Sequence, residues 1–136
     1  MHTPTEADVL AAADAIIEAF AATDTAAYFA GFSADASFVF HPESARLNSR
    51  AEYEALWAGW IASGWRVSAC SSSDRLVQPF PGGAVFSHTV ATSIDSAEGP
   101  DSYVERESIV FRVAETGGLE AIHEHLSTVP DDGSAA

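Results

Sequence analysis

VERESIVFRVAETGGLEAIHEHLSTVP, residues Val104–Pro130, is the stretch that decides the fold. Its first part, Val104–Val113, is rich in β-branched and aromatic residues, and a short acidic, glycine-bearing break follows at Glu115–Gly118. A second alternating run then extends to Pro130. This pattern predicts two antiparallel strands joined by a tight loop.

Alternation along the closing strand predicts how its side chains divide between the two faces of the sheet. One face is expected to carry Leu119, Ala121, His123, His125 and Ser127, and the other Glu120, Ile122, Glu124 and Leu126. The two imidazoles of His123 and His125 are therefore predicted to lie side by side.

The preceding strand carries two carboxyl groups, Glu105 and Glu107, on the face that also presents Tyr103, Ile109 and Phe111. Apolar surroundings disfavour the charged form of a carboxyl group, and desolvated acids of this kind are frequent at reactive sites. The alternative is a structural salt bridge to one of the arginines Arg50, Arg66 or Arg75. Arg106 and Arg112 are predicted on the opposite face, toward a partner or solvent.

Length and composition are those of one globular domain, which we expect over residues 1–130, with a disordered tail at 131–136. No apolar run approaches the roughly 18 residues that a bilayer span requires, so no membrane contact is predicted. The polar start MHTPTEADV differs from a secretory signal. Together with a single cysteine, Cys70, it favours a cytoplasmic location and excludes an internal disulfide.

The chain carries a formal charge of −14, with 20 acidic residues against six arginines and no lysine. Schiff-base chemistry on lysine and a phosphate-binding loop ending in Gly-Lys are thereby excluded. Affinity for nucleic acid depends on clustered basic residues, so the sequence does not predict nucleic acid as a partner.

The N-terminal half predicts helices and the C-terminal half predicts long strands. Helices are expected over Thr5–Ala22, from a cap at Asp24 to Phe32, and over Arg50–Ser63, with a strand at Ala36–Phe40. Strands are then expected over Trp65–Val77 and Ala84–Ile94, before the closing hairpin. This order predicts an α+β domain in which helices cover one face of a curved antiparallel sheet.

A curved sheet covered by helices leaves a pocket, which is the usual place for a small-molecule ligand. Aromatic residues at helical spacing are core candidates that also suit an apolar pocket, namely Phe20, Tyr53, Trp57 and Trp60. The other face of the sheet also needs cover. If its side chains are apolar, a homodimer follows.

The order of elements, Phe40-His41-Pro42 after the first strand and the terminal HEHLSTVP resemble the nuclear transport factor 2-like superfamily. Within it, the sequence resembles the SnoaL-like proteins and the association domain of calcium/calmodulin-dependent protein kinase II. The resemblance implies a cone-shaped, cystatin-like roll covered by three N-terminal helices, and frequent dimerisation. Activities in the superfamily range from isomerases, cyclases and dehydratases to non-catalytic scaffolds.

Comparison with the ketosteroid isomerases of this superfamily assigns roles to two residues. His41 is similar in position to their carboxylate base before a proline, and Glu107 to their neutral acid that donates to an oxyanion. Ile16 stands where they carry a first-helix tyrosine, which argues against steroid isomerisation. His88 and Ile109 stand where the kinase association domain presents arginines, which argues against recognition of an anionic peptide.

His41 and the His123–His125 pair each have two interpretations. His41 suits a general base at a pocket mouth, or it caps local backbone after a strand. His123 and His125, about 6.6 Å apart at roughly 3.3 Å per residue, either line the pocket or pack in the sheet. A shared metal would need a third ligand such as His88 or Glu107, and no metal or cofactor is predicted.

The sequence thus predicts a small-molecule-binding protein in which His41 and Glu107 perform proton-transfer chemistry on an apolar organic substrate. The predicted ligand-binding residues are Phe20, Tyr53, Trp57, Trp60, His88, Phe111, His123 and His125. The alternative is a non-catalytic binding or oligomerisation module.

Overall fold

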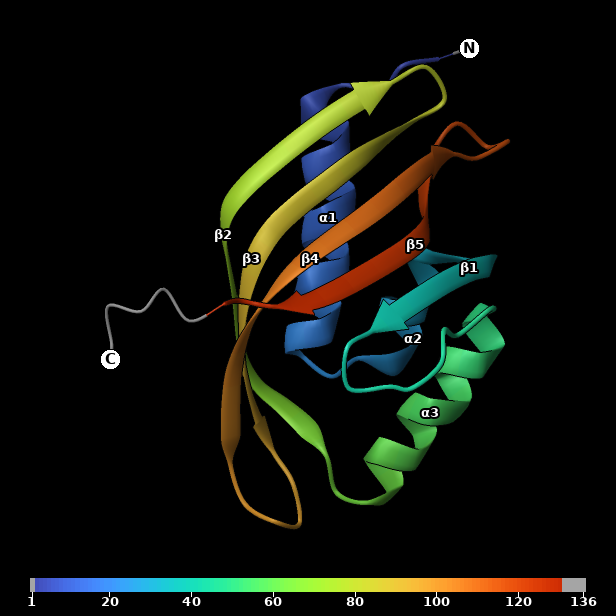
Figure 1. The fold of residues 1–136 in the computed structure, drawn as a ribbon. Coiled ribbons are helices and arrows are strands. Elements are labelled where there is room, and N and C mark those ends of the chain that lie inside the picture. The colour runs from blue at the N-terminus through green and yellow to red at the C-terminus, as the bar shows by residue number, and fades with distance from the viewer. Residues whose placement is uncertain (1, 131–136) are drawn as a thin grey trace.

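The structure is a computed structural model that describes residues 2–130, so the predicted disordered tail at 131–136 lies outside the described range. Three helices and five strands follow one another along this part of the chain (Figure 1). The helices are α1 (Glu6–Ala21), α2 (Thr25–Ala30) and α3 (Arg50–Ala62). The strands are β1 (Phe32–Phe40), β2 (Arg66–Phe80), β3 (Gly83–Asp95), β4 (Asp101–Val113) and β5 (Leu119–Thr128). The predicted α+β class is confirmed.

Each helix begins at a polar residue that caps its free amide groups. Thr5 and Asp8 form a reciprocal capping box at the start of α1, and Asp24 accepts from the Ala27 amide at the start of α2. The second helix was predicted to reach Phe32, but it ends at Ala30. The cause is long-range: Phe32 pairs with Ala121 of β5 and is buried, so sheet pairing prevails over helical spacing.

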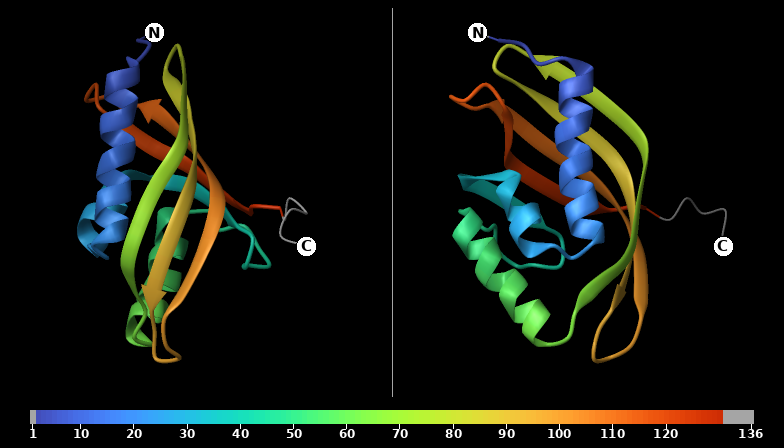
Figure 2. Two further views of the ribbon diagram at one scale, coloured as in Figure 1. Left: turned by 90° about the vertical axis from the view of Figure 1, so that its left-hand side faces the viewer. Right: turned by 180° about the vertical axis from the view of Figure 1, so that it is seen from behind.

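The five strands form one sheet in the order β1-β5-β4-β3-β2. The sheet curves around the helices, which lie on its concave side, with α1 running along it (Figure 2). Three of the four pairings are antiparallel, as predicted, but β1 pairs with β5 in parallel. Alternation of apolar and polar residues carries no information on strand direction, so the sequence could not reveal this exception.

A one-residue irregularity in β5 changes which side chains face the helices. Ala121 and His123 pair with consecutive residues of β4, so Ile122 is an extra, bulged residue. Ala121 and Glu124 are therefore both buried on the concave side. The prediction that His123 and His125 share a face with Ala121 is wrong, because the bulge reverses the alternation after Ala121.

Aromatic side chains from α2, α3 and β1 form the centre of the core. The Tyr28 ring stacks on Trp57 at a centroid distance of 4.9 Å, and the Phe38 and Tyr53 rings meet edge-on at 4.7 Å. At the sheet, Gly83 lies so close to β4 that a Cβ atom would approach the Phe111 carbonyl oxygen to 2.2 Å. Only glycine fits there.

None of the helices in the described part of the chain has the length and apolarity needed to cross a membrane.

Candidate functional site

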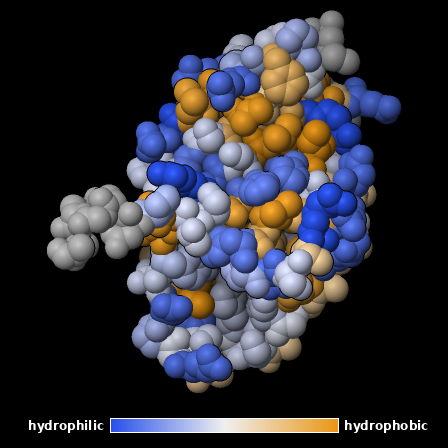
Figure 3. Space-filling view, viewed as in Figure 1, coloured by the Kyte–Doolittle hydropathy of each residue, from blue (hydrophilic) through white to orange (hydrophobic). Residues whose placement is uncertain are grey.

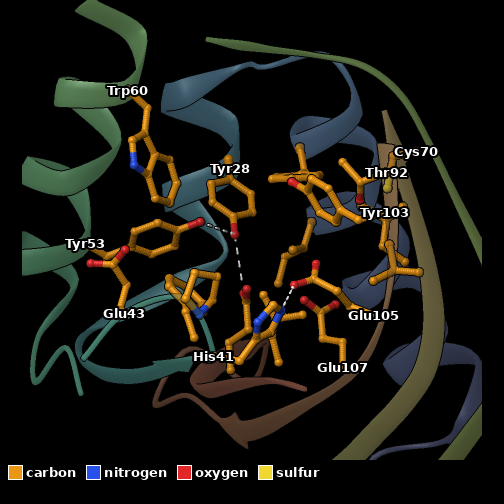
Figure 4. A pocket seen from close by; sticks show the side chains of 18 of the residues that line it. Tyr28, His41, Glu43, Tyr53, Trp60, Cys70, Thr92, Tyr103, Glu105 and Glu107 are labelled. Atoms are coloured by element: carbon orange, nitrogen blue, oxygen red, sulfur yellow. Dashed lines mark hydrogen bonds and ion pairs between the residues drawn. The ribbon is translucent and has the colours of Figure 1, made fainter. Parts of the chain in front are cut away.

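A cavity of about 320 Å³ lies between the helices and the concave face of the sheet (Figure 4). Aromatic residues form much of its wall: Phe20, Tyr28, Phe40, Tyr53, Trp60, Trp65 and Tyr103. Four carboxyl groups also line it: Glu43, Glu105, Glu107 and Glu124. An apolar pocket with a few converging polar groups is the usual form of a small-molecule site.

At one side of the cavity, His41 forms a hydrogen bond with Glu105. His41 directly follows β1 and Glu105 lies on β4, so the contact spans β5, which separates the two strands in the sheet. The His41 side chain is 34% exposed, whereas that of Glu105 is 10% exposed. A carboxylate that accepts from one imidazole nitrogen leaves the lone pair on the other nitrogen, which is the arrangement a general base requires.

Deeper in the cavity, Glu107, whose side chain is 12% exposed, and the buried Glu124 form a pair of carboxyl groups. Glu107 lies opposite Leu126 in the β4–β5 register, so Glu124, two residues earlier, is its diagonal neighbour and shares a hydrogen bond with it. Burial raises the pKa of Glu107 to about 7. Burial, followed by the adjacent Glu107 charge, raises the pKa of Glu124 well above its ordinary value. The pair therefore retains at least one proton near neutral pH.

Two tyrosines extend this pair toward the helices. The Tyr28 hydroxyl donates to a Glu124 carboxyl oxygen at 3.3 Å, and the Tyr28 and Tyr53 hydroxyl oxygens are 3.0 Å apart (Figure 4). Burial and the Glu124 charge raise the pKa of both phenols well above 10, so both keep their protons. Ile16 lines the cavity where the family comparison places a tyrosine, and the described structure supplies a hydroxyl from α2 instead.

Behind Glu107, His88 of β3 holds the carboxyl group in place. His88 Nε2 lies 2.7 Å from a Glu107 oxygen, and its Nδ1 lies 2.6 Å from the Ser72 hydroxyl. Burial, together with the nearby Arg75 charge, lowers the pKa of His88 to about 4, so the imidazole is neutral at pH 7. In this form Nε2 donates to the Glu107 carboxylate while Nδ1 accepts from Ser72.

The structure brings five of the predicted site residues to the cavity wall: His41, Glu107, Phe20, Tyr53 and Trp60. The other five predicted site residues are not among the lining residues. Trp57 and Phe111 are packed in the core, and Trp57 donates its indole N–H to Thr25. His88 lies behind Glu107.

His123 and His125 are brought together, with ring centroids 5.5 Å apart, but not at the cavity. The His123 ring forms a hydrogen bond with the Ser37 hydroxyl on the outer face of the sheet, and His125 is exposed. The expectation that they line the pocket is corrected by the bulge at Ile122, which turns them outward. Within residues 2–130, no group of three or more histidine, cysteine or acidic side chains is arranged to hold a metal ion.

Three residues with chemistry at the cavity were not among the predicted site residues: Tyr28, Glu105 and Glu124. Period-two spacing places Glu105 on the same face as Glu107, and this signal was sufficient to find it. Glu124 was hidden by the bulge, and Tyr28 by its place in an aromatic cluster that is typical of a core.

Comparison with known proteins places this geometry in a family. A model of the SnoaL-like domain matches residues 9–132. A ketosteroid isomerase-like protein from Erwinia carotovora atroseptica is similar in structure, with a TM-score of 0.77, 17% identity and coverage of 92% of this chain and 96% of that chain. Among curated proteins, none matches this sequence.

Two further solved structures share the fold. An NTF2-like protein of unknown function from Rhodospirillum rubrum has a TM-score of 0.78 and 17% identity, covering 90% of this chain and 99% of that chain. A putative calcium/calmodulin dependent protein kinase II association domain from Xanthomonas campestris has a TM-score of 0.75 and 18% identity, covering 94% and 91%. The family match extends over most of the sequence, and the chain therefore belongs to the SnoaL-like domain family, within the NTF2-like fold.

Proposed function

We propose that the cavity binds an apolar organic molecule and transfers a proton within it, in a reaction of the isomerase, cyclase or dehydratase type. One observation carries the proposal: a hydrogen-bonded imidazole–carboxylate pair and a buried pair of carboxyl groups with raised pKa line the same apolar cavity. Groups with opposed proton-transfer roles, held in different environments, are the usual form of acid–base catalysis.

His41 is the proposed base. With its Nε2–H donated to Glu105, His41 accepts the substrate proton on Nδ1, and the Glu105 carboxylate stabilises the imidazolium that forms. A positioned base of this kind contributes roughly 10² to 10⁴ in rate. Negative charge that develops on a substrate oxygen is stabilised by a group that still holds a proton near pH 7, either the Glu107–Glu124 pair, which retains at least one, or the Tyr28 hydroxyl.

The test measures proton exchange, which does not require knowledge of the complete reaction. Ligands selected from a metabolite pool by thermal shift are incubated in D₂O, and exchange of their acidic C–H positions is followed by NMR. We expect His41→Gln to slow exchange by about 10²-fold, since it removes the base. His125→Gln, on the outer face, is the matched control and keeps the wild-type rate.

Unchanged exchange in both His41→Gln and Glu107→Gln would remove these residues from the mechanism.

The second candidate function is a non-catalytic binding module, which is favoured by Ile16, a side chain without a hydroxyl, at the position of the family tyrosine. A ligand that binds without any exchange in the wild-type protein would support that alternative. A cytoplasmic location is part of the proposal, because the free Cys70 thiol suits a reducing compartment.

A further inference from the structure

The charges around the cavity are unbalanced. Its lining includes four carboxyl groups and one imidazole, but no arginine, and the chain has no lysine. The cavity lining therefore offers no fixed positive charge, and an anionic ligand would lose its hydration without gaining a counter-ion.

The arginines of the chain lie elsewhere and contact other groups. Arg50, Arg66 and Arg75 form ion pairs with Glu54, Asp95 and Asp14. Arg112 contacts Asp35 and Glu120, and Arg46 donates to the Asn48 side chain. Arg106 lies on the face of β4 opposite Glu105 and Glu107, because neighbouring side chains on a strand alternate.

Aromatic rings line the same cavity as the carboxyl groups. Phe20, Tyr28, Trp60, Trp65 and Tyr103 lie around the same cavity as Glu107 and Glu124. Ring faces attract cations, with indole the strongest, and carboxylates near such rings provide the opposite charge. Aromatic walls combined with carboxylates are the chemistry that recognises an organic ammonium ion, while the remaining aliphatic wall suits a hydrocarbon body.

We propose that the cavity takes a hydrophobic organic ammonium ion, whose nitrogen lies at Glu107 and Glu124 among the aromatic rings. This inference rests on the proposed binding function of the cavity, but not on His41 acting as a base. Glu105 is paired with His41, and Glu43 lies in the loop that follows β1. The Glu107–Glu124 pair is therefore the pair of acids on the sheet side of the cavity that has no cationic partner.

Ligand binding is then linked to proton release. The titratable groups facing the pair are Tyr28 of α2, Tyr53 of α3, Glu105 of β4 and His88 of β3. Tyr103 of β4, Cys70 of β2 and the His41–Glu43 loop also line the cavity. A bound ammonium ion supplies the cation that Glu107 lacks and lowers its pKa from about 7. The affinity for a permanent cation therefore rises from pH 5.5 to pH 8.

Three probes of similar size but different charge provide the test: benzyltrimethylammonium, its uncharged carbon isostere neopentylbenzene, and 4-phenylbutyrate. Trp60 and Trp65 line the cavity, so tryptophan fluorescence reports binding. We expect the cation to bind about tenfold more tightly than the isostere at pH 8, with a smaller preference at pH 5.5, and the carboxylate not to bind.

Glu107→Gln tests the site directly, because it keeps the shape of the acid but not its charge. We expect this variant to lose most of the preference for the cation over the isostere. Glu115→Gln, in the exposed β4–β5 loop, keeps the preference. Equal or tighter binding of the isostere or the carboxylate would overturn the ammonium assignment while leaving a binding cavity. Failure of all three probes to bind would overturn both proposals.

Discussion

Glu107 makes the stability of the protein depend on pH. Its pKa is about 7 in the folded protein and near 4.5 in an unfolded chain, so between these values the unfolded state releases its proton first. The contribution of Glu107 to the free energy of unfolding is therefore fully present below pH 4.5 and is lost as the pH rises through 7. We expect Glu107→Gln to increase the free energy of unfolding by about 3 kcal/mol at pH 8, with no gain at pH 4.

Urea denaturation at the two pH values measures this difference, with Glu115→Gln as the exposed control. An equal effect of Glu107→Gln at pH 4 and pH 8 would show that folding does not raise the pKa of Glu107.

His88 influences Glu107 through the hydrogen bond that it donates. Removal of this donor disfavours the Glu107 carboxylate, so His88→Phe is expected to raise the Glu107 pKa further and to extend the loss of stability beyond pH 7. His88→Gln retains an N–H donor and serves as the control. Denaturation midpoints between pH 6 and pH 9 distinguish the variants. The same pH dependence in His88→Phe and the wild type would contradict the role of His88.

At the level of single residues, the alternation of side chains along a strand correctly predicted which side chains of β4 face the helices. Glu107 and its apolar neighbours lie on the concave face as expected. The position of the partner acid, Glu124, on the concave face could not be predicted. It depends on a bulge, and no turn residue or glycine in the sequence indicates that bulge. The carboxyl pair is therefore a property of the β4–β5 register rather than of either strand alone.

The short helix α2 carries Tyr28 to the cavity, and it depends on its cap. Asp24 accepts from the Ala27 amide, and a cap of this kind contributes about 1 kcal/mol. We expect Asp24→Ala to lower the free energy of unfolding by about 1 kcal/mol and also to weaken binding of cavity ligands, because α2 has only six residues.

Thr5→Ala provides the matched comparison for this prediction. Thr5 caps the longer helix α1, so its loss is expected to cost a similar amount of stability. Its effect on ligand affinity should be smaller. Equal weakening of binding in the two variants would show that α2 does not control the cavity separately from global stability.

The elements themselves were largely predictable because their signals are local. The helical spacing of apolar residues, the cap at Asp24 and the glycine-bearing loops indicated the helices and hairpins. The parallel pairing of β1 with β5 could not be predicted, because it joins strands that are distant in sequence. That pairing brings the end of β1, and with it His41, toward the acids of β4.

On the scale of the molecule, the outer face of the sheet is a proposed dimer surface. Figure 3 shows hydrophobic residues gathered in the upper half of this face. Val85 pairs directly with Val110 across β3 and β4, and Val104 on the same face is 49% exposed. Serine, threonine, arginine and histidine side chains surround them, as at an interface with a polar rim.

We expect light scattering to give a mass of about twice the 14.3 kDa chain mass. Val110→Glu should convert the dimer to a monomer, because it places a charge in the apolar part of the surface. Ile61→Glu, on α3 and away from this face, should leave the mass unchanged. A monomeric wild-type protein would refute the proposed interface.

The most direct test of the central claim is a carbon-13 NMR titration of the glutamate carboxyl groups, with Glu107→Gln and Glu124→Gln used to assign the signals. Glu107 is expected to titrate near pH 7, and the pKa of Glu124 is expected well above its ordinary range, because the two groups lie beside each other in the cavity without a cation. Titration of both groups near pH 4.5 would contradict a buried, proton-holding acid pair and the site built on it.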